Sequence, residues 1–510
     1  MKMISKKLKW LWYLMALTML SCNSSADKKD PHLTKPNIVV IYADDLGFGD
    51  VSCYNSGKLQ TPGIDRLAQE GIRFNNGYAT SATCTPSRYA LLTGEYPWRN
   101  KRAQILKGDA PALIDPTAPT LPKMLKQAGY STGIIGKWHL GLGNGAIDWN
   151  NRITPGPNEI GFDEAFIMAA TNDRVPNVYV ENGLVVDLDA NDPLEVSYIN
   201  NFHGEPTGKD NPEKLRMIYS VGHNMSINNG IPRIGYQKGG KAAQWIDEDM
   251  ADTFLIRAQN FVKTHQTKPF FLFYALHQPH VPRIPHQRFA GKSGLGPRGD
   301  AILEADWCVS EFLKTLDELQ LAENTIVIFS SDNGPVLDDG YQDQAVELNG
   351  DHTPNGHLRG GKYSLFDAGT HVPFIVRWNG YIAAGTSDAL VSQVDLYASL
   401  AALTGQQNKR HDSQNLLKAF LGQTPKGRES IVLEGIGRKT AFRKGDWVLI
   451  PPYNGPAIEK GTNIELGNAK VSRLYNLKDD PSQLNNRAIE MPEKAAQLLA
   501  EMEAIINHKN

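Results

Sequence analysis

The sequence has few cysteines, almost no net charge and, beyond its first 20 residues, no long apolar run. Four cysteines among 510 residues cannot hold a chain of this size together, so a hydrophobic core must stabilise the fold. The 53 Lys and Arg residues nearly balance the 55 Asp and Glu residues, which leaves a formal charge of −2. This balance lacks the basic field that attracts nucleic acid, and we expect no nucleic-acid partner. Hydrophobic residues make up 41% and charged residues 21% of the chain, which excludes wholesale disorder.

The first residues are typical of an export signal rather than of a folded domain. Four lysines within residues 2–9 precede an apolar run over residues 10–20. This run is shorter than the roughly 20 residues of a membrane-spanning helix, but it has the length of a signal-peptide core. A serine and Cys22 follow, an arrangement that resembles a bacterial lipobox. We therefore expect residues 1–21 to be a lipoprotein-type signal peptide with acylation at Cys22 as a lipid anchor, which predicts export to the periplasm or outer membrane. Ordinary secretion with cleavage nearby is the alternative.

Apolar, β-branched runs alternate with amphipathic segments as far as about residue 405. Strands are predicted at 37–42, 130–135, 270–276 and 325–330, and helices at 61–71, 121–128, 250–264 and 301–320. Fully apolar strands separated by helices are typical of a largely parallel sheet covered on both faces. Residues 144–245 are rich in Asn, Gly and Pro with weak periodicity, so we expect long insertions over the sheet. The predicted fold class is α/β, with one large domain over residues 33–405.

The pattern changes after Gly405, where residues 406–414 form a polar linker. Short strands are predicted at 431–434, 440–442, 447–450 and 473–477, with a hairpin turn at 443–446 and an amphipathic helix at 492–507. Strands followed by a terminal helix indicate a smaller α+β unit. We therefore predict an antiparallel-sheet-plus-helix subdomain over residues 406–510.

Acidic and amide side chains follow two of the predicted strands. Asp44 and Asp45 follow the strand at 37–42, and Asp332 and Asn333 follow the strand at 325–330. Ligands bind at the carboxyl ends of strands in α/β sheets, and carboxylate and amide oxygens suit Ca²⁺ or Mg²⁺. Because Asp and Asn also begin loops and cap helices, either pair alone would favour a structural role. Together the two pairs favour a metal site.

Cys84 stands at the start of another predicted helix. The segment Cys84-Thr-Pro-Ser-Arg88 leads into an apolar run that ends at Gly94. Pro86 suits the first helical position, so Cys84 should lie just before the helix N-terminus. The backbone N–H groups and helix dipole there favour an anion, which Arg88, one turn further on, could also reach. These features predict a reactive thiol beside an oxyanion site.

The motif Cys84-x-Pro-Ser-Arg88, followed by Leu-Thr-Gly94, resembles the signature of the type I sulfatases, which belong to the alkaline-phosphatase-like superfamily. Further motifs of that family occur in the same order along residues 36–487: Asp44-Asp45, Gly136-Lys137-Trp138-His139, Gln278-Pro279-His280-Val281-Pro282, Ser331-Asp332-Asn333-Gly334, Gly360-Gly361-Lys362 and Leu474-Tyr475-Asn476-Leu477. The resemblance implies a large mixed, mostly parallel sheet sandwiched by helices, with a smaller C-terminal α+β subdomain. It also implies that a maturation enzyme converts Cys84 to Cα-formylglycine.

The resemblance implies one Ca²⁺, whose ligands match Asp44, Asp45, Asp332, Asn333 and the formylglycine at Cys84. The hydrated aldehyde has two hydroxyls: one attacks sulfur, and the other then expels sulfate, a step that a serine or thiol could not perform. Arg88, Lys137 and Lys362 match the cations that hold the sulfate oxygens. His139 matches a histidine beside the formylglycine, and His280 the one that protonates the leaving oxygen. Lys137 and His139 are two residues apart, so on an extended segment they would point the same way.

Substrate contacts are predicted from loops. His277 could share a role with His280 or contact the sugar, and Asp173 and Arg174 lie in a candidate sugar-contacting loop, although an ordinary surface turn is equally compatible with their sequence. The resemblance implies a sulfuric ester hydrolase that removes O-sulfate from a sulfated oligosaccharide or polysaccharide. Two alternatives stay open: a phosphoryl or phosphonyl ester hydrolase of the same superfamily, and a glycan-binding protein in which Cys84 remains unconverted.

Overall fold

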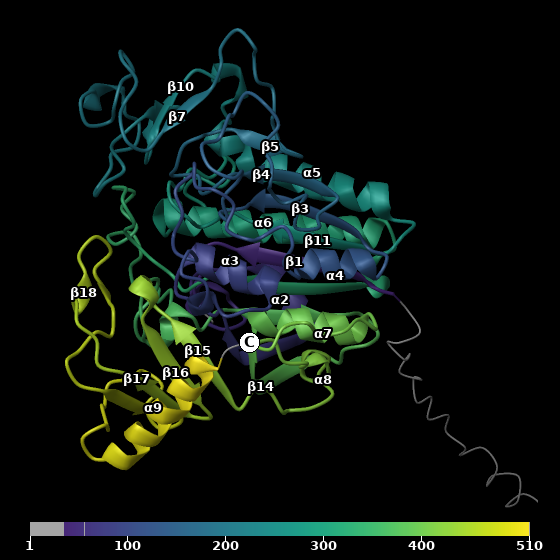
Figure 1. The fold of residues 1–510 in the computed structure, drawn as a ribbon, viewed down its shortest axis with the longest axis vertical. Coiled ribbons are helices and arrows are strands. Elements are labelled where there is room, and N and C mark those ends of the chain that lie inside the picture. The colour runs from purple at the N-terminus through teal and green to yellow at the C-terminus, as the bar shows by residue number, and fades with distance from the viewer. Residues whose placement is uncertain (1–34, 56, 509–510) are drawn as a thin grey trace, which may run out of the picture.

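The computed structural model describes residues 35–55 and 57–508, so the predicted signal peptide and Cys22 lie outside the described residues. Ten strands form the central sheet in the spatial order β14 (Gly385–Ser392), β2 (Ile72–Tyr78), β13 (Phe374–Arg377), β12 (Thr325–Ser331), β1 (Asn37–Ala43), β11 (Phe270–Ala275), β3 (Ser131–Lys137), β4 (Glu164–Met168), β5 (Tyr179–Glu181) and β6 (Leu184–Val185). The five strands from β12 to β4 are mutually parallel, and β13, β5 and β6 run antiparallel to their neighbours. This is the mixed, mostly parallel sheet that the sequence predicts (Figure 1).

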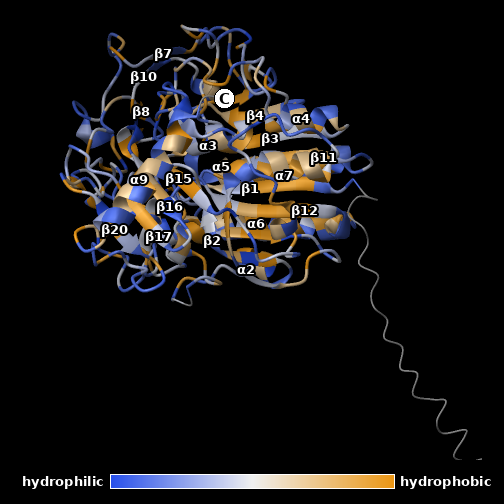
Figure 2. Cartoon of the chain, turned by 60° about the horizontal axis from the view of Figure 1, so that its bottom comes forward, coloured by the Kyte–Doolittle hydropathy of each residue, from blue (hydrophilic) through white to orange (hydrophobic). Residues whose placement is uncertain are grey.

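Alternating side chains on the strands build a hydrophobic core on each face of the sheet. In β1, Ile38, Val40 and Tyr42 pack into one core, whereas Val39 and Ile41 pack into the other. The helices α3 (Cys84–Thr93), α4 (Leu121–Gln127) and α7 (Leu396–Leu403) contribute to the first core, and α2 (Pro62–Gln69), α5 (Met250–His265) and α6 (Gly296–Glu318) to the second. Burial on both faces explains why the central strands are continuous apolar runs, drawn in orange in Figure 2.

The four strands and four helices whose bounds are predicted in the first 405 residues all form, and most of these bounds differ from prediction by one or two residues. The exception is α6, which begins at Gly296 instead of residue 301. Pro297 occupies its first turn, where the missing N–H of proline costs no hydrogen bond. The first residues of α6 are not apolar, so the spacing of apolar residues alone does not reveal where this helix begins.

The expectation that residues 144–245 form only insertions over the sheet is wrong in part. Strands β4, β5 and β6 lie within this range and extend the central sheet beyond β3. The strand β4 is five residues long, and the Asn, Gly and Pro residues on both sides of it, which are typical of loops, obscure its short apolar run. The rest of the range is largely irregular and contains two small antiparallel pairs, β7 (Glu195–Ser197) with β10 (Tyr236–Lys238) and β8 (Ile227–Asn228) with β9 (Ile231–Pro232).

The C-terminal residues form a separate antiparallel sheet in the order β15 (Ser430–Glu434), β16 (Thr440–Lys444), β17 (Trp447–Ile450) and β20 (Arg473–Asn476). Helix α9 (Pro492–Asn507) packs Leu498 and Met502 into the same cluster as Phe442 and Leu449 of this sheet. Figure 1 shows these elements in green to yellow beside one end of the central sheet. The β16–β17 turn is shorter than predicted, since Lys444 already pairs with Trp447. Within the described part of the chain, no helix has the length and apolarity needed to cross a membrane.

Candidate active site

The carboxyl ends of β1 and β12 bring the four predicted metal ligands together. The two strands are parallel neighbours, and the Asp332 N–H donates to the Ala43 carbonyl at 3.1 Å. The Asp45 N–H donates to Asp332 Oδ1 at 3.2 Å, and Asn333 Nδ2 donates to Asp45 Oδ1 at 2.7 Å. Asp45 has a φ of 62°, so the chain leaves the extended conformation directly after Asp44. All four side chains are buried, as expected for residues at an internal edge of the sheet.

Lys137 and Arg88 neutralise two of these carboxylates. Lys137 Nζ at the end of β3 donates to Asp44 Oδ2 at 2.6 Å and lies 3.6 Å from Asp332 Oδ2. Arg88 of α3 donates from Nε and Nη2 to Asp332 Oδ2 at 3.0 and 2.8 Å. Burial favours a high pKa for Asp332, but Arg88 and Lys137 outweigh burial and lower this pKa to about 2. Burial holds the pKa of Asp44 well above its ordinary value despite Lys137, and repulsion from Asp332 and Asp45 adds to this effect. A divalent cation would relieve that repulsion.

Lys362 connects the same cluster to a carboxylate that sequence reasoning missed. Lys362 Nζ donates to Asp45 Oδ2 at 2.7 Å and to Asp339 Oδ2 at 2.7 Å. The Tyr363 hydroxyl donates to Asp339 Oδ1 at 3.1 Å. Burial opposes ionisation of Asp339, but Lys362 outweighs it and lowers the pKa of this carboxyl, which is therefore ionised at neutral pH. The Asp-Asp-Gly segment at 338–340 is typical of a polar turn, so nothing in its sequence points to the site.

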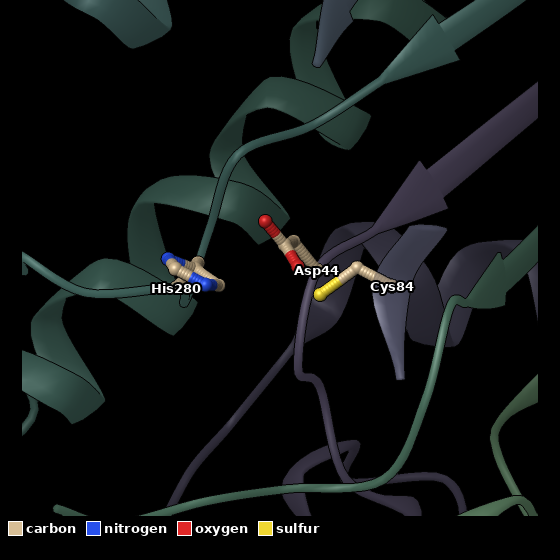
Figure 3. Close-up of side chains that lie close together, drawn as sticks. All are labelled: Asp44, Cys84 and His280. Atoms are coloured by element: carbon tan, nitrogen blue, oxygen red, sulfur yellow. The ribbon is translucent and has the colours of Figure 1, made fainter. Parts of the chain in front are cut away.

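Cys84 lies at the centre of these groups. Helix α3 begins at Cys84 itself rather than at Pro86, and all of its ten residues are buried. The sulfur and one carboxylate oxygen from each of Asp44, Asp45 and Asp332 all lie within 4.8 Å of one another. Figure 3 shows Cys84 and Asp44 from one side and His280 from another directed toward the same space. Burial raises the pKa of the Cys84 thiol far above its ordinary value, although Lys137 opposes this. A neutral thiol is a poor nucleophile.

The oxygen atoms of this site fit a hard divalent cation. Asp44 Oδ1 and Asn333 Oδ1 are buried, and neither has a hydrogen-bond partner among the described residues. An unpartnered buried acceptor costs roughly 1–3 kcal/mol, so each such atom requires an explanation. Both belong to the predicted metal ligands and, with Asp45 and Asp332, they offer the all-oxygen donor set that Ca²⁺ prefers. The residues present therefore fit a calcium ion.

Two histidines border the cluster in different ways. His280 Nδ1 is 2.7 Å from the Val281 carbonyl, so Nδ1 carries the proton, and Nε2 is 3.8 Å from Asp45 Oδ2. Burial lowers the pKa of His280 well below its ordinary value, and Lys362 lowers it further. His139 donates from Nε2 to the Leu106 carbonyl at 2.9 Å. Its Nδ1 is buried without a partner in the described part of the chain.

The extended segment expected from Lys137 to His139 does not form. Strand β3 ends at Lys137, and His139 has a φ of 56°. A left-handed residue breaks the alternation on which the expectation depends. The two side chains consequently take different partners, Asp44 for Lys137 and the Leu106 carbonyl for His139.

Asp173 and Arg174 belong to a buried network and not to an ordinary surface turn. Asp173 Oδ1 accepts a hydrogen bond from Arg174 Nη1 at 2.8 Å, and Asp173 Oδ2 lies 2.9 Å from His223 Nε2. Asn172 Nδ2 donates to the Pro282 carbonyl at 3.1 Å, which ties this loop to the segment that carries His280. The structure thus brings Asp173 and Arg174 to the region of the predicted site.

His277 is also buried near His280. Its ring centroid lies 6.0 Å from that of Phe254, and its Nδ1 has no hydrogen-bond partner among the described residues. His277, His280 and Asn172 line one small cavity. Burial lowers the pKa of His277 to about 4, so its imidazole is neutral at neutral pH.

Glu434 of the C-terminal sheet contacts the segment that precedes Cys84, a relationship that no local sequence signal indicates. Its N–H donates to the Thr80 carbonyl at 2.9 Å, and its carbonyl accepts from the Ala82 N–H at 2.7 Å. Ser81 Oγ lies 3.4 Å from Glu434 Oε1. Burial raises the pKa of Glu434 to about 8. The C-terminal sheet therefore helps to hold the backbone ahead of Cys84.

Comparison with known proteins agrees with this geometry. The family model described as Sulfatase matches residues 36–406. An N-acetylgalactosamine-6-O-sulfatase of Bacteroides thetaiotaomicron is 51% identical over 510 residues, covering 99% of each chain. Human arylsulfatase A is 33% identical over 407 residues, which span 78% of this chain and 70% of the human protein.

A solved structure from work on the metabolism of multiple glycosaminoglycans by Bacteroides thetaiotaomicron has the same architecture. It superposes with a TM-score of 0.92 and 52% identity, covering 93% of this chain and 100% of that chain. The family match extends from before Asp44 to beyond Lys362, so it includes every residue of the cluster described above. This chain therefore belongs to the sulfatase family.

Proposed function

We propose that this sulfatase hydrolyses the 6-O-sulfate ester of N-acetylgalactosamine units in a sulfated oligosaccharide or polysaccharide. The reaction type follows from the family. The site is assigned from one arrangement: Cys84 lies among three carboxylates, two of which are paired with Lys137 and Arg88. The sugar is inferred from the N-acetylgalactosamine-6-O-sulfatase that matches the chain over its whole length at 51% identity. The phosphoryl or phosphonyl ester hydrolase and the binding protein remain as alternatives for direct test.

Asp44, Asp45, Asp332 and Asn333 would hold one Ca²⁺, with the residue at position 84 completing the site. A bound Ca²⁺ supplies Lewis-acid polarisation and lowers the pKa of a neighbouring hydroxyl. The unpartnered oxygens of Asp44 and Asn333 support this assignment. The carboxylates of Asp44, Asp45 and Asp332 repel one another in the absence of a cation, which also favours binding.

We also propose that residue 84 acts as Cα-formylglycine, which a maturation enzyme forms from Cys84. The hydrated aldehyde would supply one hydroxyl that attacks sulfur and a second that releases sulfate. The state of the unmodified residue supports this, because burial raises the pKa of the Cys84 thiol and leaves it uncharged. A buried neutral thiol lacks the reactivity that the reaction needs.

Arg88, Lys137 and Lys362 would bind the sulfate oxygens and stabilise the charge that develops on them during transfer. Each is buried and paired with a carboxylate: Arg88 with Asp332, Lys137 with Asp44 and Lys362 with Asp45. These pairs fix the cations before substrate arrives, so little reorganisation is needed at the moment of reaction.

His280 would protonate the leaving oxygen from Nε2, the ring nitrogen that faces Asp45. In the substrate-free protein burial and Lys362 lower the pKa of this imidazole. A negative sulfate ester offsets the positive charge of Lys362, so substrate binding favours the protonated form. His139 Nδ1 is an unprotonated acceptor, because Nε2 donates to Leu106, and it would accept a hydrogen bond from the residue at position 84. Asp173, Arg174 and His277 would contact the sugar.

Export as a lipoprotein remains a proposal that rests on residues 1–22 alone. Labelling of growing cells with a radioactive fatty acid tests it: the wild-type chain should carry label, and Cys22→Ala should not. Label on the Cys22→Ala chain, or none on the wild type, would contradict acylation at this residue.

The test of the proposed reaction is sulfate release by protein in which Cys84 has been converted and calcium is present. We expect release from N-acetylgalactosamine 6-sulfate and much less from N-acetylgalactosamine 4-sulfate. Matched aryl sulfate and aryl phosphate esters separate the alternative: a higher kcat/KM for the phosphate would favour the phosphoryl hydrolase. A Cys84 peptide that mass spectrometry shows to be unconverted, together with binding of sulfated sugars without release, would favour the binding protein.

A further inference from the structure

Asp339 is the outermost charged group of the cluster around Lys362. Its side chain is 14% exposed, whereas those of Lys362 and Asp45 are each 1% exposed. Oxygen and nitrogen atoms of Asp339, Asp45 and His280 lie within 4.8 Å of one another. Asp339 therefore stands beside the proposed proton donor, with part of its carboxylate open to a ligand.

The loop that carries Asp339 is held from outside by the insertion between β4 and α5. The Ser220 N–H donates to the Gly340 carbonyl at 2.9 Å, and the Ser220 hydroxyl donates to Asp338 Oδ1 at 2.8 Å. The Gln342 N–H donates to the Ile218 carbonyl at 2.8 Å. These bonds lie on both sides of Asp339, so its backbone has a fixed place.

Gly340 shows how closely the two segments approach. Its φ is 106°, and a Cβ there would lie 1.9 Å from His223 Nδ1, so only glycine fits. The His223 ring also packs on Tyr341, with centroids 4.7 Å apart. His223 Nε2 lies 2.9 Å from Asp173 Oδ2, so the loop of Asp339 and the loop of Asp173 share one support.

A fixed carboxylate is an unexpected neighbour for a sulfate site. A carboxylate repels the sulfate ester and cannot donate to its oxygens. Lys362 is already paired with Asp45 at 2.7 Å, so neutralisation of Lys362 alone does not require a second, partly exposed acid. What a carboxylate can do at this position is accept a hydrogen bond from an uncharged hydroxyl of the sugar, and repel a second anionic group placed there.

We propose that Asp339 is a specificity-determining residue, which accepts a hydrogen bond from a free hydroxyl close to the sulfated position and rejects sugars that carry a second sulfate in its place. The inference rests on the proposed function, since it concerns the sugar bound at that site. It predicts that the enzyme prefers monosulfated to disulfated sugar units. The positive charges of Arg88, Lys137 and Lys362 alone would favour the more negatively charged, disulfated sugar.

The test compares kcat/KM for N-acetylgalactosamine 6-sulfate and N-acetylgalactosamine 4,6-disulfate in the calcium-bound, converted protein. Asp339→Asn removes the charge but keeps the size and the loop, so the preference for the monosulfated sugar should fall by about tenfold or more. The ratio of the two substrates cancels any common effect of the change on Lys362 or on folding. Asp338→Asn, on the same loop but bonded to Ser220, serves as the control and should keep the wild-type ratio.

If Asp339→Asn lowered kcat/KM equally for both sugars, the proposal would be overturned, and Asp339 would be a partner of Lys362 only. If the variant has too little turnover, the same comparison is made by calorimetry of the two sugars binding to Cys84→Ser protein with and without Asp339→Asn. An unchanged affinity ratio there would likewise overturn it. The activity of the wild-type protein on the monosulfated sugar separately tests the proposed function. Failure of the specificity role of Asp339 can therefore be distinguished from failure of the proposed function.

Discussion

Arg88 donates two hydrogen bonds to a single oxygen of Asp332, at 2.8 and 3.0 Å, and both side chains are completely buried. This pair fixes a predicted metal ligand and a predicted sulfate-binding cation with one contact. Asp332 holds its charge because burial, which opposes ionisation, is outweighed by Arg88 and Lys137.

The first prediction concerns this pair. Arg88→Ala leaves Asp332 as a buried charge without its main partner, which destabilises a protein by about 3–5 kcal/mol. Arg88→Lys keeps the charge but cannot direct two donors of one planar group at the same Asp332 oxygen, so we expect a smaller loss of stability and a large loss of activity. Urea unfolding monitored by circular dichroism measures the first effect. A variant Arg88→Ala as stable as the wild type would show that the pair does not hold the site.

The second prediction concerns calcium. Chelation should abolish activity and lower the unfolding temperature, because Asp44, Asp45 and Asp332 then repel one another without a cation. Restored Ca²⁺ at 100 times its dissociation constant should stabilise the fold by about 2.7 kcal/mol, as measured by calorimetry. In Asp44→Asn the stabilisation should be much weaker at the same concentration. An identical calcium effect in this variant would exclude Asp44 as a ligand.

The third prediction concerns the pH dependence of stability at Glu434. Its pKa rises on folding from an ordinary 4.5 to about 8, so the folded state keeps a proton that the unfolded state loses. The stabilising contribution is complete below pH 4.5 and is lost as the pH rises to about 8. Glu434→Gln should therefore gain stability over the wild type by about 2–4 kcal/mol at pH 8 and little at pH 4.5. Guanidinium unfolding at both pH values measures this difference.

The exposed Glu490 provides a matched control, because its side chain is 67% exposed. Glu490→Gln should behave like the wild type at both pH values. If Glu434→Gln showed no gain at the higher pH, the carboxyl at 434 would be ionised in the folded protein, contrary to the account.

The convergence of the four candidate metal ligands could be predicted from the sequence because its signals are local. Asp44 and Asp332 each follow a continuous apolar strand, and the carboxyl ends of parallel strands meet at one edge of a sheet. The register of β1 on β12 then sets the two aspartates side by side. The place of Cys84 at a helix N-terminus also has a local signal, because Pro86 indicates a helix start, although the helix begins two residues earlier, at Cys84.

Asp339 and Glu434 could not be predicted, because their roles arise from contacts between distant segments. The position of Asp339 is set by hydrogen bonds between its own loop, which includes Gln342, and the insertion that contains Ser220. Neither segment has a periodic sequence pattern. The strand that contains Glu434 has no unusual sequence feature. Glu434 contacts the segment ahead of Cys84 only because it pairs with Ser81, which is 353 residues away. The strand β4 was missed for a different reason, since its short apolar run lies within a segment rich in Asn, Gly and Pro, which are typical of loops.

The fourth prediction concerns His280. Loss of the proposed proton donor matters most when the leaving oxygen is a poor leaving group, such as a sugar hydroxyl. His280→Asn should lower kcat/KM for N-acetylgalactosamine 6-sulfate by about 10²–10⁴-fold, but that for a nitrophenyl sulfate far less, because nitrophenolate leaves without protonation. Steady-state kinetics on both substrates measure the difference. Equal losses on the two would assign His280 a role other than protonation of the leaving group.

Mass spectrometry of the Cys84 peptide, combined with sulfate release from N-acetylgalactosamine 6-sulfate, tests the proposed reaction most directly. Sulfate release should rise in proportion to the fraction of peptide carrying the aldehyde and be absent in Cys84→Ala, which should retain the wild-type circular dichroism spectrum. Sulfate release by the folded Cys84→Ala variant, or none by fully converted and calcium-loaded protein, would contradict the proposed reaction.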